Sequence, residues 1–436
     1  MASTYLNRTF STPTNNKKWT YSLWVKRASP STDNGLLSCG ANGNNRGLIY
    51  ISSGNTLGYF DTDSGTDTTT IVTNRLFRDV SAWYHIVIAV DTTQATSSDR
   101  VKIYVNGTQE TSLSSSTYPL QNYDGYINSG IRHDISGRNH QGTSDLYFDG
   151  EMAHVNFIDG TAYDASAFGE TDATTGIWKP KTTPSVTYGN NGFFLKFENS
   201  GAFGTDSSGN ANNFTVNGTM TQTIDTPSNV FATMNPLDKT PFGTSITYSD
   251  GNTTTTASAG TDWTTRYSFS SLAITQGKWY AECKVGNVGV SNQFYLGVIK
   301  DRQTATINSS LGGIANGYGY YANSGNILNN GSDLSTSGAS YTTGDIIGMA
   351  LDLDNGTLDF YKNGVAQGDQ VTGLDTSALW QFANNAYQNA IWNWNFGNPP
   401  FTIASGNSDA NGYGNFEYAV PSGYYALNTK NLAQYG

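Results

Sequence analysis

The chain has 436 residues, which is enough for two domains of about 150 to 200 residues with separate cores. Charged residues make up only 13% and the net charge is −11, whereas phosphate binding needs clustered Lys and Arg, so we expect no nucleic-acid partner. We also expect no signal peptide and no membrane insertion, because no apolar run approaches the roughly 18 residues of a membrane span.

Residues 1–220 contain many short apolar strands that are separated by Gly, Asn and Ser. This pattern predicts an antiparallel β-sandwich or jelly roll. Its clearest part is the alternating strand at residues 85–91 (HIVIAVD), followed by a polar loop and a returning strand at residues 101–107 (VKIYVNG). The final Asn-Gly favours a tight turn.

A polar loop in this half offers three carboxylates to a cation. Asp61, Asp63 and Asp67 lie in FDTDSGTDTTT, and hard oxygen ligands in a flexible, Gly-containing loop are what calcium prefers. The alternative is a polar hairpin loop without metal. Calcium is the cofactor that the sequence suggests.

The two cysteines, Cys39 and Cys283, fall one in each half of the chain. A disulfide between them would have to join two domains. We therefore expect two reduced, buried thiols.

Residues 221–245 contain three prolines among Thr and Asn, which predicts a linker. The strand pattern resumes at 246 and continues to 401. A Gly-, Asn- and Tyr-rich tail follows at 402–436, and its aromatic residues suggest that it packs against a folded surface.

The strongest hairpin signal is residues 344–365 (GDIIGMALDLDNGTLDFYKNGV). Apolar residues alternate on both sides of Asp354-Asn355-Gly356, which can form a tight reversal, and Asn363-Gly364 predicts a second turn. Because this returning strand ends in Asn-Gly like the one at 101–107, the chain holds two copies of one unit and is best divided into two related domains.

This hairpin resembles the signature of SPRY domains, and residues 277–285 and 392–401 resemble the early and late strands of that family. Residues 19–28, 83–91, 101–107 and 148–163 resemble a laminin-G-like, concanavalin A-like module in the order of their strands. The fold class implied is all-β, with two concanavalin A-like antiparallel β-sandwiches (jelly rolls) in tandem, at 1–220 and 246–401.

Residues 225–238 and 421–432 resemble segments of structural and tail-fibre-like proteins of marine tailed phages. This resemblance implies a virion protein, made in the host cytoplasm and exposed on the particle, with other virion structural proteins as partners. Phage fibres are commonly trimers, which would make this protein a homo-oligomer, but no heptad shaft is present to enforce a trimer.

An enzyme is not expected. Glucanases of the concanavalin A-like group need two carboxylates on either side of the scissile bond, and the run that carries them is absent. Asp149 and Glu151 lie on one strand face, but a pair beside a glycine is more typical of a solvated strand end. The four histidines all lie in the N-terminal half, without a Gly-x-Ser-x-Gly elbow.

Ligand binding is the remaining possibility. Tyr318, Tyr320 and Tyr321, interleaved with Gly and Asn, are the candidate sugar-binding residues, since aromatic rings stack on sugars while amides bind hydroxyls. The alternative is that these tyrosines only cover the sheet. Trp392 and Trp394 are expected in the core.

The sequence therefore predicts a non-enzymatic phage surface protein that binds host-surface polysaccharide. The alternatives are a purely structural capsid decoration or tail-associated subunit and, third, a glycan-processing enzyme.

Overall fold

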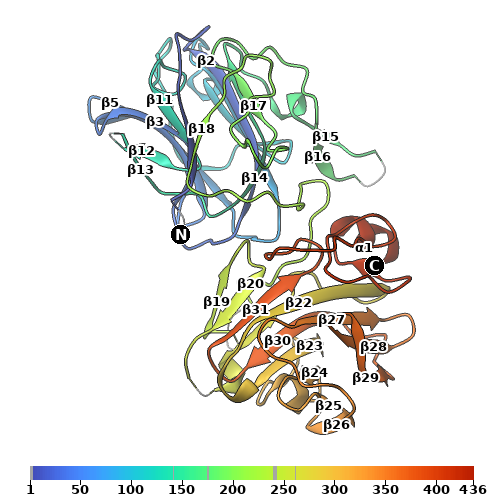
Figure 1. The fold of residues 1–436 in the computed structure, drawn as a ribbon. Coiled ribbons are helices and arrows are strands. Elements are labelled where there is room, and N and C mark those ends of the chain that lie inside the picture. Colours follow the sequence, from blue (N-terminus) through green and yellow to red (C-terminus); the bar gives the residue numbers. More distant parts are fainter. Residues whose placement is uncertain (1–2, 141, 174–175, 239–242, 261) are drawn as a thin grey trace. The chain divides into compact units, whose positions relative to one another are not determined.

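A computed structural model describes the whole chain except residues 1–2, 141, 174–175, 239–242 and 261 (Figure 1). The chain forms two compact units, Met1–Ser228 and Asn229–Gly436. Each unit is built on two large antiparallel sheets, which confirms the prediction of an all-β protein with tandem β-sandwiches. Within the described residues, no helix has both the length and the apolar character needed to cross a membrane.

The first unit contains an eight-stranded and a six-stranded sheet with an apolar core between them, which includes Trp19, Tyr21 and Ile88. In sheet order, the first sheet consists of β10 (Leu113–Thr117), β6 (Thr66–Leu76), β5 (Thr56–Asp63), β4 (Asn45–Ile51), β3 (Asn34–Asn42), β11 (Arg132–Ile135), β1 (Tyr5–Thr9) and β18 (Thr215–Asn217). The second consists of β17 (Phe193–Leu195), β14 (Gly150–Asp159), β2 (Lys18–Arg27), β7 (Tyr84–Asp91), β8 (Val101–Val105) and β9 (Thr108–Glu110). Two small ribbons are formed by β12 (Arg138–His140) with β13 (Thr143–Asp145), and by β15 (Gly169–Thr171) with β16 (Trp178–Pro180).

The second unit has the same two-sheet plan. Its larger sheet consists of β19 (Ile246–Ser249), β20 (Thr254–Ala257), β31 (Ala390–Asn395), β22 (Lys278–Val288), β27 (Ile346–Asp352), β28 (Thr357–Lys362) and β29 (Val365–Thr372), with β32 (Tyr425–Ala426) parallel to β22. The smaller consists of β21 (Tyr267–Phe269), β30 (Trp380–Ala386), β23 (Phe294–Lys300), β24 (Gly317–Tyr321), β25 (Ile327–Asn329) and β26 (Ser332–Ser335). The α-helix α1 (Thr429–Tyr435) lies near the C-terminus.

The predicted hairpins form as the alternation and turns require. Strands β27 and β28 pair in antiparallel register, and Asp352 holds the turn by accepting hydrogen bonds from the backbone N–H groups of Asp354 and Asn355. Gly356 has φ of 67°, which glycine adopts at little cost. The second predicted turn, Asn363-Gly364, connects β28 to β29, and Asn106-Gly107 connects β8 to β9 in the first unit in the same way.

The core predictions are confirmed. Trp392 and Trp394 are fully buried between the sheets of the second unit, and Phe396 lies with them. Cys39 and Cys283 are both free and buried.

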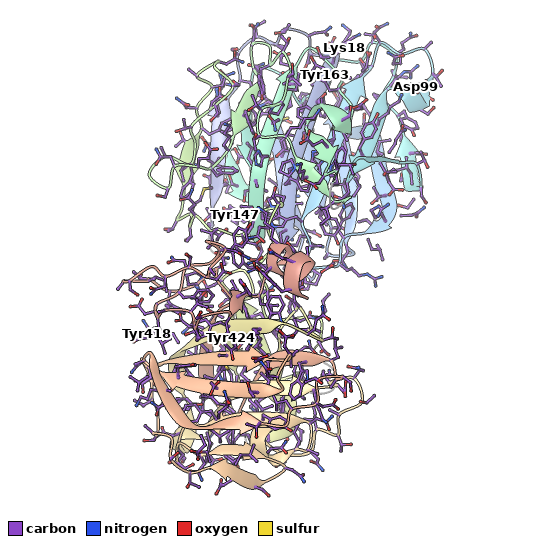
Figure 2. All side chains as sticks on the ribbon, turned by 90° about the vertical axis from the view of Figure 1, so that its right-hand side faces the viewer. Lys18, Asp99, Tyr147, Tyr163, Tyr418 and Tyr424 are labelled. Atoms are coloured by element: carbon purple, nitrogen blue, oxygen red, sulfur yellow. The ribbon has the colours of Figure 1, made fainter. Side chains whose placement is uncertain are left out.

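The tail, residues 402–436, covers the outer face of the larger sheet of the second unit. Glu282 of β22 faces this cover, and its carboxylate accepts hydrogen bonds from the backbone N–H groups of Glu417 and Tyr418 at 2.9 and 2.8 Å. Phe416 packs on the same face. Figure 2 labels Tyr418 on this segment.

The expected linker, residues 221–245, is shorter in the structure. The boundary between units falls after Ser228, and Phe231 and Met234 are buried in the second unit. The backbone N–H of Ala232 donates to the carbonyl of Leu427 at 2.9 Å. The prolines of this segment suggested a free connection. Its pairing gave no local signal, because Asn428, which forms a β-bridge with Phe231, is about 200 residues away in the sequence.

This packing predicts that Met234 contributes to the stability of the fragment 229–436. Replacing Met234, which is fully buried, by Ala should lower the free energy of unfolding by about 2 to 5 kcal/mol, because a cavity is left in the core. Leu237→Ala, at a side chain that is 50% exposed, is the control and should change it by about 0.5 kcal/mol or less. Urea denaturation measures both, and equal effects of the two substitutions would contradict the assignment of residues 229–238 to this core.

Candidate functional site

The three predicted tyrosines do not form one surface. They lie on β24, where successive side chains point to opposite faces. Tyr320 is fully buried in the core between the sheets, 5.3 Å from the ring of Phe360, and its hydroxyl donates to the carbonyl of Ala339. Tyr318 packs on the same side, 5.6 Å from Trp380. A sugar platform made of all three tyrosines is therefore wrong.

The glycines between these tyrosines explain the pattern. Gly317 and Gly319 face outward, where the turn at Leu311–Gly313 passes over the sheet. A Cβ on Gly319 would lie 3.0 Å from the backbone nitrogen of Gly312. The Gly-Tyr alternation thus places rings in the core and leaves room for a loop on the other face.

Tyr321 belongs instead to an aromatic cluster on the outer face of the smaller sheet. The cluster, which we call the aromatic patch, consists of Trp263, Tyr295, Tyr321 and Tyr387. Tyr295 stacks on Tyr321 with ring centroids 4.5 Å apart, and Trp263 lies edge-on to Tyr295 at 5.7 Å. Tyr387 is 5.4 Å from Trp263. Tyr295 is nearly buried, whereas the other three rings are partly exposed.

Two hydrogen bonds to the backbone hold the residues of the patch in place. Trp263 begins a short 3-10 turn (Trp263–Thr265), and its carbonyl accepts from Asn385 Nδ2 at 2.9 Å. The backbone N–H of Tyr387 donates to the carbonyl of Gln293 at 3.0 Å. These bonds fix the ends of three chain segments, so the rings stand on a rigid base.

The most buried ring of the patch, Tyr295, is held in its neutral form. Burial raises the pKa of Tyr295 to about 12, with smaller contributions from Tyr321 and Asp333. A neutral aromatic surface is suited to a neutral, hydroxyl-rich ligand, because aromatic rings pack on the C–H groups of sugars. Only Tyr321 was a candidate from the sequence, since the four members of the patch are separated from one another by more than twenty residues.

The three carboxylates proposed for calcium are not gathered at one point. Strand register places Asp67 opposite Thr62, and Thr62 Oγ1 donates to Asp67 at 2.7 Å. Asp61 is fully buried, where it accepts from the hydroxyl of Tyr123 at 2.8 Å and from the backbone N–H of Tyr126 at 2.9 Å.

Because β5 and β6 alternate, Asp67 projects on the side of Thr62, away from Asp61 and Asp63. Among the described residues, no three His, Cys, Asp or Glu side chains are close enough to hold a metal ion. The hairpin interpretation therefore explains this loop.

A buried Ser-His pair in the first unit has the wrong tautomer for nucleophilic catalysis. His85 Nε2 lies 2.9 Å from Ser22 Oγ, and the indole N–H of Trp178 donates to His85 Nδ1 at 3.0 Å. An indole N–H can only donate, so the proton of neutral His85 is on Nε2 and faces the serine. Burial lowers the pKa of His85 to about 3, and the ring cannot act as a base toward Ser22 at neutral pH.

The first unit also has a cleft of about 270 Å³ at one edge of its sandwich. Lys102 and Asp99 form a salt bridge of 3.2 Å along it, and Asp99 is labelled in Figure 2. Tyr118 is the aromatic ring in its lining. The aromatic patch offers more stacking surface and is the stronger candidate.

Comparison with known proteins agrees with this division of the chain. Residues 2–166 match the family described as the concanavalin A-like lectin/glucanases superfamily, and residues 278–396 match the SPRY domain family. The two domain types expected from the sequence, an N-terminal concanavalin A-like domain and a C-terminal SPRY domain, are thereby confirmed, whereas a phage origin is not addressed by these matches.

Curated relatives match a limited part of the chain. The Ran-binding proteins 9/10 homolog of Drosophila melanogaster is 30% identical over 125 residues, which are 29% of this chain and 13% of the relative. Ran-binding protein 10 of Danio rerio is 30% identical over 127 residues, which are 29% of this chain and 20% of the relative. The chain thus spans a fifth or less of the length of these relatives.

Solved structures show a distant likeness. The SPRY domain of human HERC1 is 20% identical, with a TM-score of 0.28, and covers 32% of this chain and 86% of that chain. The CBM40 domain of the Ruminococcus gnavus IT-sialidase, bound to α2,3 sialyllactose, is 20% identical with a TM-score of 0.25, and covers 31% of this chain and 71% of that chain.

The positions of Asp61, Asp63 and Asp67 predict that calcium does not change the thermal stability of the first unit. Addition of calcium or of a chelator should leave the melting temperature unchanged, because Asp61, Asp63 and Asp67 do not converge. Calorimetry of the full chain checks this. A chelator-dependent shift that disappears in Asp63→Ala would restore the calcium site.

The buried histidines predict that the first unit loses stability in acid. Burial lowers the pKa of both His85 and His133 to about 3, from an ordinary value of 6.5. The unfolded chain therefore takes up protons that the folded unit does not, and stability that is present at pH 7 is lost as the pH falls from about 6.5 toward 3. The loss is about 1.4 kcal/mol per pH unit for each histidine, partly offset by Glu151 and Asp61, whose pKa values burial raises to about 8 and about 6.

Urea denaturation of the fragments 1–228 and 229–436 between pH 7 and pH 4.5 measures this effect. The second fragment contains no histidine and serves as the control. We expect a steeper decline in the first, and a flatter profile in its His133→Gln variant. Parallel profiles of the two fragments would show that the histidines do not govern the acid response.

Proposed function

We propose that this protein is a non-enzymatic recognition protein that binds glycan. The proposal starts from its two domains, a concanavalin A-like domain followed by a SPRY domain. The observation that carries the proposal is the aromatic patch of Trp263, Tyr295, Tyr321 and Tyr387. Three of its rings are partly exposed, and the side-chain amide of Asn385 donates to the carbonyl of Trp263. The tautomer of His85, which cannot activate Ser22, supports the non-enzymatic part.

We further propose that the protein is displayed on the surface of a phage particle and binds host-surface polysaccharide there. The resemblance of residues 225–238 and 421–432 to segments of phage structural and tail-fibre-like proteins supports this placement. Other virion structural proteins would then be its partners, and a homo-oligomer such as a trimer its functional form.

Display on a particle would compensate for weak binding at a single aromatic patch. A single open sugar site usually binds with a dissociation constant of about 1 mM, or about −4 kcal/mol. Repetition of the site on one particle raises the apparent affinity by about 10² to 10⁴ without any new contact. Weak individual sites are therefore compatible with firm attachment.

The proposal predicts that removal of one exposed ring weakens binding. On a glycan array probed with the particle-displayed protein, Trp263→Ala and Tyr321→Ala should each bind about two- to tenfold more weakly per site, since an aromatic stacking contact contributes about 0.5 to 1.5 kcal/mol. Tyr418→Ala is the matched control, because Tyr418 is a partly exposed tyrosine of the same unit that lies on the other sheet.

If the displayed wild type binds no host-derived glycan, a purely structural role in the particle is the better explanation. If both patch variants bind as the wild type does, glycan recognition occurs elsewhere. Loss of binding with Tyr418→Ala alone would move the site to the tail.

A further inference from the structure

Three ionisable side chains meet on the outer face of the six-stranded sheet of the first unit. Lys26 lies on β2, and Glu151 is its direct cross-strand partner on β14. Asp225, from the segment that follows β18, forms an ion pair with Lys26 Nζ through Oδ2. Lys26 and Asp225 are 199 residues apart in the sequence.

The contact between Lys26 and Asp225 is shielded from water. Their side chains are 4% and 1% exposed, and Glu151 Oε2 is inaccessible to solvent. The indole N–H of Trp83 donates to the other oxygen of Asp225, Oδ1, at 3.5 Å. Each oxygen of the Asp225 carboxyl group thus has its own partner, with Oδ2 at the amine of Lys26.

The other ion-paired lysines in the described part of the chain do not share this environment. Every other lysine that forms an ion pair among the described residues has a side chain at least 25% exposed. Exposed pairs remain hydrated and charged. Lys26 alone among these lysines combines burial with a second carboxyl group as its direct strand neighbour.

Burial makes charge costly in this cluster and favours proton sharing. Burial, followed by the charge of Asp225, raises the pKa of Glu151, so this group holds a proton at a higher pH than an ordinary glutamic acid. Burial lowers the pKa of Lys26, but the charges of Asp225 and Glu151 outweigh it and the net direction is upward. One proton moved from the Lys26 ammonium to the Asp225 carboxylate converts the ion pair to a neutral amine and a neutral acid.

We propose that Lys26 and Asp225 condense to an intramolecular isopeptide bond, with Glu151 as the proton-transfer group. The neutral Nζ attacks Cγ of the Asp225 carboxylic acid, and the C–N bond forms. Glu151 accepts a proton from Nζ and delivers one to the departing hydroxyl oxygen, the C–O bond breaks, and one water leaves. The products are a secondary amide and water, and no oxidant or other reactant is needed.

Fixed geometry supplies what this reaction lacks in solution. An amine and a carboxylic acid do not condense readily in water, because both are charged and the acid is hydrated. In this cluster the two groups are held in contact by folding, which replaces a bimolecular encounter, and water is excluded. The amide also removes two buried charges from the site.

The first test is the mass of the wild-type protein under denaturing conditions. We expect a mass lower by one water, about 18 Da, than the sequence requires, judged against the Lys26→Arg variant after correction for the substitution. Trypsin should release residues 19–27 covalently joined to residues 197–239, because the acylated Lys26 is no longer cleaved. An unmodified mass, or separate peptides with free Lys26, would overturn the proposal whatever the variants show.

The second test is the role of Glu151. Glu151→Gln should retain the full mass, as should Asp225→Ala, because the first lacks the proton-transfer group and the second lacks the acyl carbon. Lys278→Arg, at a lysine that is 31% exposed and paired with Asp352, is the matched control and should still lose one water. Loss of water in Glu151→Gln would leave the bond but refute proton transfer by Glu151.

Discussion

In both units the central strands are buried on both faces, and this constraint decides where the long connections lie. On β2, Tyr21 and Leu23 face the core while Trp24 faces outward, yet all three are buried. The outer face must therefore be covered, and the segment that contains Phe168 and Trp178 does this in the first unit. In the second unit the tail covers β22 and residues 305–314 cover β23.

The sequence predicted the parts of the fold that depend on local order. Period-two alternation and Asn-Gly turns identified the hairpins, and the bulk of Trp392 and Trp394 identified the core. Alternation does not show which face is covered, however. The Gly-Tyr run of β24 was therefore interpreted as an exposed binding loop, whereas its glycines admit a crossing turn and Tyr320 lies inside.

The candidate sites depended on tertiary contacts and were mostly beyond prediction. Asp61, Asp63 and Asp67 have a spacing that calcium loops use, but strand register directs Asp67 to the side of Thr62. The aromatic patch joins rings from four separate segments, and Tyr321 was the only member with a local signal. In the same way, residues 148–151 (FDGE) appeared to be a solvated strand end. Glu151 lies opposite Lys26, and Asp225, which pairs with Lys26, is far along the chain.

The contact between Lys26 and Asp225 also determines how tension would enter the first unit. The chain leaves this unit through β18, a three-residue strand at the edge of its sheet, which a pull could peel away one hydrogen bond at a time. Asp225 lies beyond β18 and is fastened to β2, a central strand with neighbours on both sides. A pull on residue 228 therefore reaches the middle of the sandwich first, where many hydrogen bonds must shear together.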